Sequence, residues 1–475
     1  MPSQSNPRNR SPQSSSPPSP PRSFSRLFLI RQSQPDDVST LSRMAKMVYF
    51  INLPPNEQII LGKIEHSNRC FASLGSGVSG PPRIPPSRGV TSLTAMEQDS
   101  VFFMFSMEDV GGGEDGDARA GSGRQAPQDR LVGTSQVRAH QGGPGNPNWA
   151  FKITEKKHYS DSLKFGTTHA VGQLYGDESG PTEIGGLIIQ PSYRGHEQRP
   201  GRLLSFIRFH FIGLHRALFA DRILAEMMAP VTADGDNIIW DAFGRKFIPV
   251  KFAEADRFCQ HNRSFIPELL PKEEIYLSLF PLEVQNALGV VSRETIPARR
   301  LLESMGFAYR GFVDPFDGGP HLDALTDDVP MIKETRMLSA GKAAKYEQCD
   351  TGAIVSCISS DAHAPGGRAG QRNTIAGGFR ATQTRVLVDG QTVRMSANVM
   401  NLLGVRPGSR VGFTPVDSWL KRAEALTKEV ASTTPFKQAR PRPAPTPAAR
   451  GKKAQPPRKR PTKVASKPAS KRSSK

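Results

Sequence analysis

Residues 183–204 read Glu183-Ile-Gly-Gly-Leu-Ile-Ile-Gln-Pro-Ser-Tyr-Arg-Gly195-His-Glu-Gln-Arg-Pro-Gly201-Arg-Leu-Leu204 and carry the clearest structural pattern in the chain. Its apolar run predicts a strand at 184–189, and a Gly- and Arg-rich turn then leads into a long apolar helix expected at 202–218. Unpaired N–H groups at the start of a helix lie at the positive end of its dipole, where a pyrophosphate binds readily. The turn therefore predicts a phosphate-binding loop, with Arg194 and Arg202 adding positive charge.

The two ends of the 475-residue chain supply its formal net charge of +19. Residues 436–475 hold 14 Lys or Arg, residues 1–35 hold five Arg, and neither stretch contains an acidic residue. The residues between them carry no net charge, so the body of the protein has no basic character that would indicate nucleic-acid binding. We expect disordered tails at 1–26 and 436–475, with weak polyanion or nucleic-acid contact as the alternative role of the second.

The rest of the pattern predicts a mixed α/β (α+β) fold. Gly- and Pro-rich inserts near 74–92 and 110–128 separate early strands at 27–31, 101–105 and 131–137, and a helix is expected at 36–45. Segments 240–247 and 301–307 each end a helix at Gly and soon continue with Phe, which favours tandem half-folds. Short strands at 386–388, 391–395 and 409–413, with a turn at Asp389-Gly390, predict a small β-rich domain at 344–416.

The order strand, Pro-x-Tyr-Arg-Gly, Gly-Arg-Leu-Leu, helix resembles the coenzyme A pyrophosphate loop of the GNAT superfamily of N-acyltransferases. The wider sequence resembles arginine N-succinyltransferase from about residue 27 to 416. Collinear segments carry this resemblance, among them Ala225-Glu-Met227, Glu268-Leu-Leu-Pro-Lys272, Pro297-Ala-Arg299, Gly306-Phe307 and Phe316-Asp-Gly-Gly-Pro320. It implies a GNAT-like mixed sheet flanked by helices, with an acyltransferase domain at 27–340.

The resemblance also implies an activity. The enzyme would transfer succinyl from succinyl-CoA, its co-substrate, to the α-amino group of L-arginine, the first step of succinyl-transfer arginine catabolism. Two alternatives stay open: an N-acyltransferase for a different amine such as ornithine or a different acyl-CoA, and a weakly active coenzyme A-binding protein that docks on polyanions through its basic tail. A homo- or hetero-oligomer is compatible with each of them.

Roles for particular residues follow from the resemblance. Glu226 is a base relay or a paired structural carboxylate. Asp317 binds the amine substrate, although an aspartate at this position also fits a turn-forming residue. The residues that would hold coenzyme A are Leu187 and Ile189 along the pantetheine arm, and Arg194, Gly195, Gly201, Arg202 and Leu203 around the pyrophosphate.

One position departs from the family pattern. The family's presumed proton-donor histidine falls on Ser292, whose hydroxyl cannot replace imidazole near neutral pH. Three outcomes are open: the thiolate leaves without a donor, the activity or specificity is altered, or another histidine reaches the site. The histidines considered for this role are His210, His261 and His321.

The remaining expectations concern cysteines, metals and membranes. Cys70, Cys259, Cys349 and Cys357 are widely spaced, which predicts buried free thiols in a reducing compartment. No close His or Cys pair indicates a metal site, so we expect none. No apolar run is long enough to cross a bilayer, and we expect a cytoplasmic enzyme with no membrane partner.

Overall fold

The computed structural model describes residues 26–47, 53–74, 100–111, 130–232, 234–259, 263–359 and 378–417. Nearly all of the two predicted tails and of the inserts near 74–92 and 110–128 lies outside these residues. The strands are β1 Leu27–Gln32, β2 Phe102–Gly111, β3 Leu131–Arg138, β4 Asn148–Ser160, β5 Phe165–Asp177, β6 Thr182–Ile189, β7 Arg222–Glu226, β8 Ile275–Tyr276, β9 Ala308–Val313, β10 Pro320–Leu325, β11 Arg336–Ala340, β12 Thr351–Ser359, β13 Gly378–Asp389, β14 Thr392–Arg394 and β15 Arg410–Pro415. The α-helices are α1 Val38–Ala45, α2 Glu57–Leu74, α4 Pro200–Leu214, α5 Arg245–Phe247, α6 Phe252–Cys259, α7 Phe265–Leu269, α8 Leu282–Ala287, α9 Ile296–Ser304, α10 Pro330–Glu334 and α11 Ala397–Leu403.

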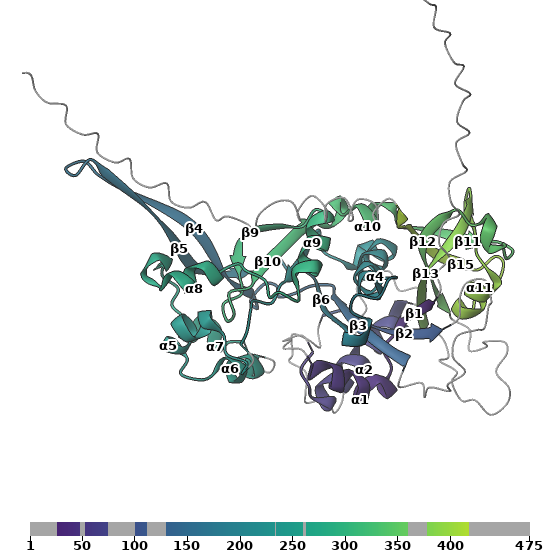
Figure 1. Cartoon of the computed structure of the whole chain (residues 1–475), viewed down its shortest axis with the longest axis horizontal. Coiled ribbons are helices and arrows are strands. Elements are labelled where there is room, and N and C mark those ends of the chain that lie inside the picture. The colour runs from purple at the N-terminus through teal and green to yellow at the C-terminus, as the bar shows by residue number, and fades with distance from the viewer. Residues whose placement is uncertain are drawn as a thin grey trace, which may run out of the picture. The chain divides into compact units, whose positions relative to one another are not determined.

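The described strands form one mixed sheet in the order β12-β15-β11-β14-β13-β1-β2-β3-β6-β7-β10-β9-β4-β5-β8. Neighbours are antiparallel except for the parallel pairs β6–β7 and β11–β14. β4 and β5 form a long two-stranded hairpin (Figure 1). The predicted combination of helices with a mixed sheet is confirmed.

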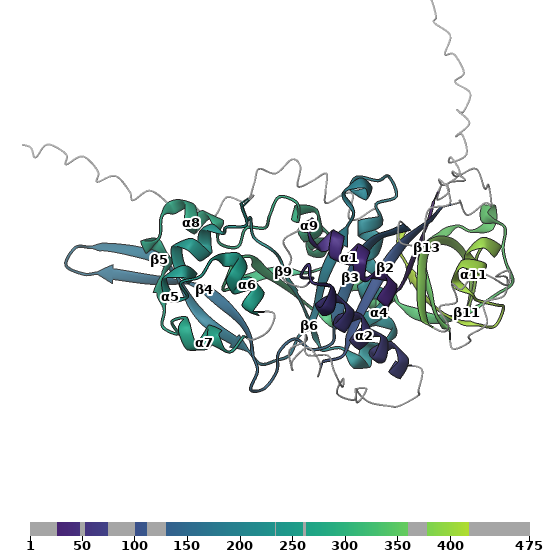
Figure 2. The same cartoon turned by 90° about the horizontal axis from the view of Figure 1, so that it is seen from below.

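Helices cover both faces of the sheet around β2 and β3 (Figures 1 and 2). Successive side chains of a strand point to opposite faces. Accordingly, Phe103 and Phe105 of β2 pack in a core with α4, whereas Phe102 and Met104 pack with α1 and α2. The almost fully buried α4 lies against β3 and β6, and this packing fixes its first turn beside the end of β6.

Strands β11 to β15 enclose a hydrophobic cluster of their own, which includes Leu338, Val355 and Phe413. The predicted strands here and the Asp389-Gly390 turn are confirmed, with Gly390 at φ +56°. β13 also pairs with β1, so these strands continue the sheet. β11 pairs with β14 and β15 although it precedes the boundary between 27–340 and 344–416, and that boundary remains a prediction.

Two predicted helix ends are wrong. α4 ends at Leu214, and residues 216–218 form a separate 3-10 turn. The helix at 240 does not end at Gly244, because a π-helical turn, Trp240–Gly244, continues into α5. A Cβ on Gly244 would lie 2.2 Å from the Trp240 ring, so this glycine permits close packing. Gly306, at φ +95°, does follow the end of α9. The two Gly-Phe segments are therefore not equivalent, and the tandem half-folds remain a prediction.

The four cysteines are buried and free, as predicted. Burial raises the pKa of the thiols of Cys70 and Cys357 to about 11, so both are protonated near neutral pH. Of the helices that the structure describes, none combines the length and the hydrophobicity needed to cross a bilayer.

Candidate active site

The end of β6 separates from β7. Within the described chain these parallel strands pair only through Thr182 and Glu183 of β6, although β6 continues to Ile189. On its other edge β6 stays paired with β3, where Gly186 adopts φ +56° beside an irregularity in the register. Glu226, the last residue of β7, lies two residues past the last paired position. The ends of β6 and β7 therefore point the same way and diverge.

The loop between β6 and α4 contains two residues in the left-handed region, Gly195 at φ +79° and Arg199 at φ +48°. α4 begins at Pro200, which favours the first helical turn, and no side chain caps this end. The first N–H groups of a helix have no partner within the helix. This end of α4 can therefore bind an anion at the positive end of the helix dipole.

The predicted coenzyme-binding residues fall into three groups. Arg194 and Gly195 are exposed, and Arg194 forms an ion pair with Glu294 at 3.2 Å. Leu203 is only 4% exposed and packs in the core, so only its backbone is left to contact a ligand. The half-buried residues are Leu187, Ile189, Gly201 and Arg202.

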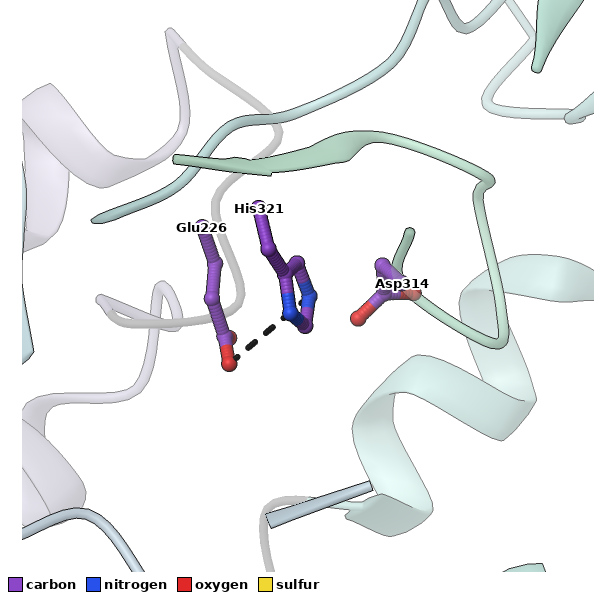
Figure 3. A group of neighbouring side chains, drawn as sticks. All are labelled: Glu226, Asp314 and His321. Atoms are coloured by element: carbon purple, nitrogen blue, oxygen red, sulfur yellow. Dashed lines mark ion pairs between the residues drawn. The ribbon is translucent and has the colours of Figure 1, made fainter. Parts of the chain in front are cut away.

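Four polar side chains meet at the end of β7. Glu226 lies opposite His321 of β10 in the antiparallel register. Asn148, the first residue of β4, donates from Nδ2 to Glu226 Oε1 at 2.7 Å. His321 Nε2 lies 3.9 Å from the same oxygen, and a carboxylate oxygen of Asp314 completes a group whose polar atoms all lie within 4.8 Å of one another (Figure 3). Strands β4, β7 and β10 and the residue after β9 thus converge on one site.

The turn before β10 holds Asp317 through the backbone. Asp317 Oδ2 accepts from the Ala229 N–H at 2.9 Å, and Oδ1 accepts from the Gly319 N–H at 2.7 Å. A Cβ on Gly319 would lie 2.0 Å from the Met227 carbonyl oxygen, so only glycine lets the turn pack this closely. These contacts confirm Asp317 as a turn-forming residue, and its contact with substrate remains a prediction.

Several carboxyl groups are buried together here. Burial, followed by the charges of Asp317 and Glu226, raises the pKa of Asp314. Burial also raises the pKa of Asp317, against the lowering effect of its two backbone hydrogen bonds. On α6, burial and the Asp314 charge raise the pKa of Asp256 to about 7. On β6, burial and the Glu226 charge raise the pKa of Glu183. A bound cation would stabilise the ionised form of each group.

An apolar cavity explains part of this effect. It lies between the β4–β5 hairpin, β9 and α8, and Asp314 is the one charged residue among its lining residues. Apolar walls keep water from that carboxyl group and so disfavour its charged form. The larger lining side chains are Phe151, Phe243, Phe280 and Leu288.

Ser292 lies beside the residues that follow β7. Its N–H donates to the Met228 carbonyl oxygen at 2.9 Å, and its hydroxyl lies 3.0 Å from Thr295 Oγ1. The Met227 N–H points the other way, to the Pro320 carbonyl oxygen at 3.0 Å. Because consecutive residues of an extended segment bond to opposite sides, Ser292 lies on the edge from which β6 has separated and β10 lies on the other edge.

The three candidate histidines have different surroundings. His210 is fully buried in α4, with its two ring nitrogens 2.6 Å from Thr414 Oγ1 and 2.7 Å from Ser356 Oγ. Burial lowers its pKa to about 3, so it is a neutral structural residue. His261 lies outside the described residues. Of the two histidines that the structure describes, His321 is the one at the carboxyl cluster.

Sequence reasoning missed Asn148, Asp256 and Asp314 as members of the site. Asp314 lies two residues before the Phe316-Asp-Gly-Gly-Pro320 motif, and this was the available signal. Asn148 precedes its partner Glu226 by 78 residues, and no local sequence pattern predicts that the two residues pair. Glu226, Asp314 and His321 are also chemically suited to hold a divalent metal ion, since imidazole and carboxylates are common ligands. The expected absence of a metal stays a prediction.

The chain is similar to known proteins over much of its length. The family model described as "Arginine N-succinyltransferase beta subunit" matches residues 124–331. The arginine N-succinyltransferase of Yersinia pestis is 30% identical over 313 residues, 65% of this chain and 78% of that protein. The enzyme of the same name from Photorhabdus laumondii is 31% identical over 283 residues, which are 59% of this chain and 77% of the relative.

A solved structure has a similar fold. It is described as the structure of arginine/ornithine succinyltransferase subunit AI from Pseudomonas aeruginosa. The TM-score is 0.61 at 22% sequence identity, and the match covers 82% of this chain and 99% of the other. At this identity the similarity concerns the fold.

Proposed function

Because this chain belongs to the arginine N-succinyltransferase family, we propose that the diverging ends of β6 and β7 form the site at which succinyl passes from succinyl-CoA to the α-amino group of L-arginine. The family gives the activity. The observation that supports this location is the separation of β6 from β7 between an uncapped helix start and a largely shielded carboxyl cluster.

We propose a GNAT-like path for the acyl donor. The pyrophosphate lies at the first turn of α4, where Gly195 and Gly201 leave the backbone accessible and Arg194 and Arg202 supply positive charge. The pantetheine arm runs along the end of β6 past Ile189 and Leu187 toward the level of Glu226. Four residues of extended strand span about 13 Å, which is the length of this path along β6.

The carboxyl cluster supports a cationic acceptor. L-arginine carries a positive guanidinium group, and its amine is charged before it reacts. Asp317 is buried, and Asp314 and Asp256 are half-buried carboxyl groups. Desolvation raises the pKa of all three, so their charged forms are poorly solvated. A bound guanidinium or ammonium group would replace the missing solvation, so arginine binding and ionisation of the cluster favour each other.

The reaction joins the amine nitrogen to the thioester carbonyl carbon. The α-ammonium group first gives one proton to solvent, which leaves a neutral amine. The amine nitrogen then loses a second proton as the C–N bond forms, the C–S bond breaks, and the sulfur leaves with the electron pair and takes up one proton. The residues of this chain orient the amine, hold the thioester beside it and move that proton. Glu226, fixed by Asn148, is placed to orient the amine or to relay its proton.

Release of free thiol from succinyl-CoA tests the function, with arginine, ornithine and lysine offered as acceptors. We expect saturable release with arginine and a product that carries one succinyl group on the α-nitrogen. Ornithine is the second candidate acceptor, because the Pseudomonas aeruginosa relative is described as an arginine/ornithine succinyltransferase. An unchanged thiol signal with every acceptor would contradict the proposed function. Assembly into an oligomer and polyanion contact through residues 436–475 remain proposals.

A further inference from the structure

His321 is buried beside the proposed reaction site, and one of its ring nitrogens has no hydrogen-bond partner among the described residues. Its side chain is 5% exposed, and this nitrogen is Nε2. Glu226 Oε1 lies 3.9 Å from this nitrogen and already accepts from Asn148. That separation is longer than a hydrogen bond. A buried imidazole nitrogen without a partner is costly, unless a ligand supplies the partner.

His321 and Ser292 lie on either side of the same short segment. Pro320 bonds to Met227 on one edge of the extension of β7, and Ser292 bonds to Met228 on the other. Neighbouring extended segments lie about 4.8 Å apart, so the backbones on the two sides are about 10 Å apart. A substrate amine at the end of β7 would be within side-chain reach of either position.

We propose that His321 carries the proton of the reaction, in place of the histidine that the family resemblance puts at position 292. This inference rests on the proposed function. The neutral imidazole accepts the proton that the α-amino nitrogen loses as the C–N bond forms. The same proton passes from the imidazolium to the coenzyme A sulfur as the C–S bond breaks, so His321 ends the cycle in its starting state.

The neighbours of His321 suit this role. Glu226 on β7 and Asp314 after β9 lie beside it, and the acidic groups that interact with Asp314 include Asp317 and, on α6, Asp256. The positively charged Arg263, before α7, reaches Asn148. Such surroundings stabilise the transient imidazolium. His210, in contrast, has both ring nitrogens engaged by hydroxyl groups and lies among the C-terminal strands.

The test moves the histidine between the two positions. The full-length chain is compared with His321→Gln, His321→Asn, Ser292→His and the double variant Ser292→His/His321→Gln. We expect kcat to fall about 100-fold or more in His321→Gln, with KM for succinyl-CoA within about twofold. Adding Ser292→His to the His321→Gln variant should raise kcat at least about tenfold above that of His321→Gln alone. The exposed His158→Gln on β4 is the matched control and should keep full activity.

Two readouts separate proton transfer from a structural role. The fall of kcat/KM toward low pH, set by the basic group, should disappear in His321→Gln and return in the double variant. Thermal unfolding and succinyl-CoA binding check that each variant is folded, and His321→Asn serves if His321→Gln is not.

Several outcomes are decisive. A wild-type chain without acceptor-dependent thiol release would overturn the proposed function, and this inference with it. An active wild type with a folded His321→Gln variant within threefold of its kcat would overturn the inference alone. Loss of wild-type activity with a chelator, restored by zinc alone, would make Glu226, Asp314 and His321 a metal site and also overturn it.

Discussion

Asp256 has one carboxylate oxygen, Oδ1, that is buried and has no hydrogen-bond partner in the part of the chain that the structure describes. Burial and the Asp314 charge raise its pKa to about 7, above the value of about 3.9 expected in the unfolded chain. An acid shifted in this direction destabilises the folded state. The penalty is complete above pH 7 and fades as the pH falls from about 7 to about 4, where both states are protonated.

Asp256→Asn should therefore stabilise the protein at high pH. We expect the free energy of unfolding to rise by roughly 1–3 kcal/mol at pH 8, because the substitution removes a charge that desolvation and the Asp314 carboxylate disfavour. The gain should shrink at pH 6 and again at pH 5. Urea unfolding at the three pH values measures it, with the exposed Asp161→Asn as the control. A gain that is equal at all three values would contradict a raised pKa.

The start of α4 offers a test of coenzyme binding at the level of one loop and one helix. Gly201 does not have a positive φ, and a Cβ added there would meet Ile189 at 3.7 Å, an ordinary contact. The protein itself therefore has room for alanine at 201. Gly195 differs, because its φ of +79° strains any other residue even though the space around it is open.

Gly201→Ala should leave the thermal midpoint unchanged or slightly raised, since alanine favours the helix. If the pyrophosphate approaches the backbone here, we expect KM for succinyl-CoA to rise about tenfold, which corresponds to about 1.4 kcal/mol of lost binding. KM for arginine should stay within twofold. Gly195→Ala is the comparison, because it disturbs the loop through backbone strain. Unaltered succinyl-CoA binding in Gly201→Ala would show that the pyrophosphate lies elsewhere.

The same elements show which parts of the fold can be predicted from the sequence. The apolar run of β6, the turn and α4 follow from local pattern, because a strand, left-handed glycine and a first-turn proline are local preferences. Gly244 misled the prediction because close packing against Trp240 and helix termination both select glycine. Only the packed structure separates these two causes.

Across the whole molecule, the site depends on the order of strands in the sheet. Glu226 and His321 become neighbours because β7 pairs with β10, and Asn148 reaches Glu226 from the start of β4. No periodicity encodes such pairings, so the sequence placed Glu226 at the site through the family motif but left His321 as one of three histidines. Asp256 and Asp314 went unnoticed for the same reason.

The basic residues 436–475 affect the behaviour of the molecule as a whole, and their removal is the last test. Deleting them takes away 14 of the positive charges and no part of the described sheet. We expect kcat and the thermal midpoint to stay unchanged within error, because the proposed site lies entirely outside the deleted residues. A tail of equal length with Gln in place of every Lys and Arg is the matched control.

Binding to a labelled DNA duplex should be weak in the full chain and should fall steeply between 50 and 200 mM salt, as expected for phosphate contacts. It should vanish in both altered proteins. If the deletion instead abolished turnover, the tail would belong to the catalytic unit. If DNA binding survived the deletion, another part of the chain would hold the contact surface.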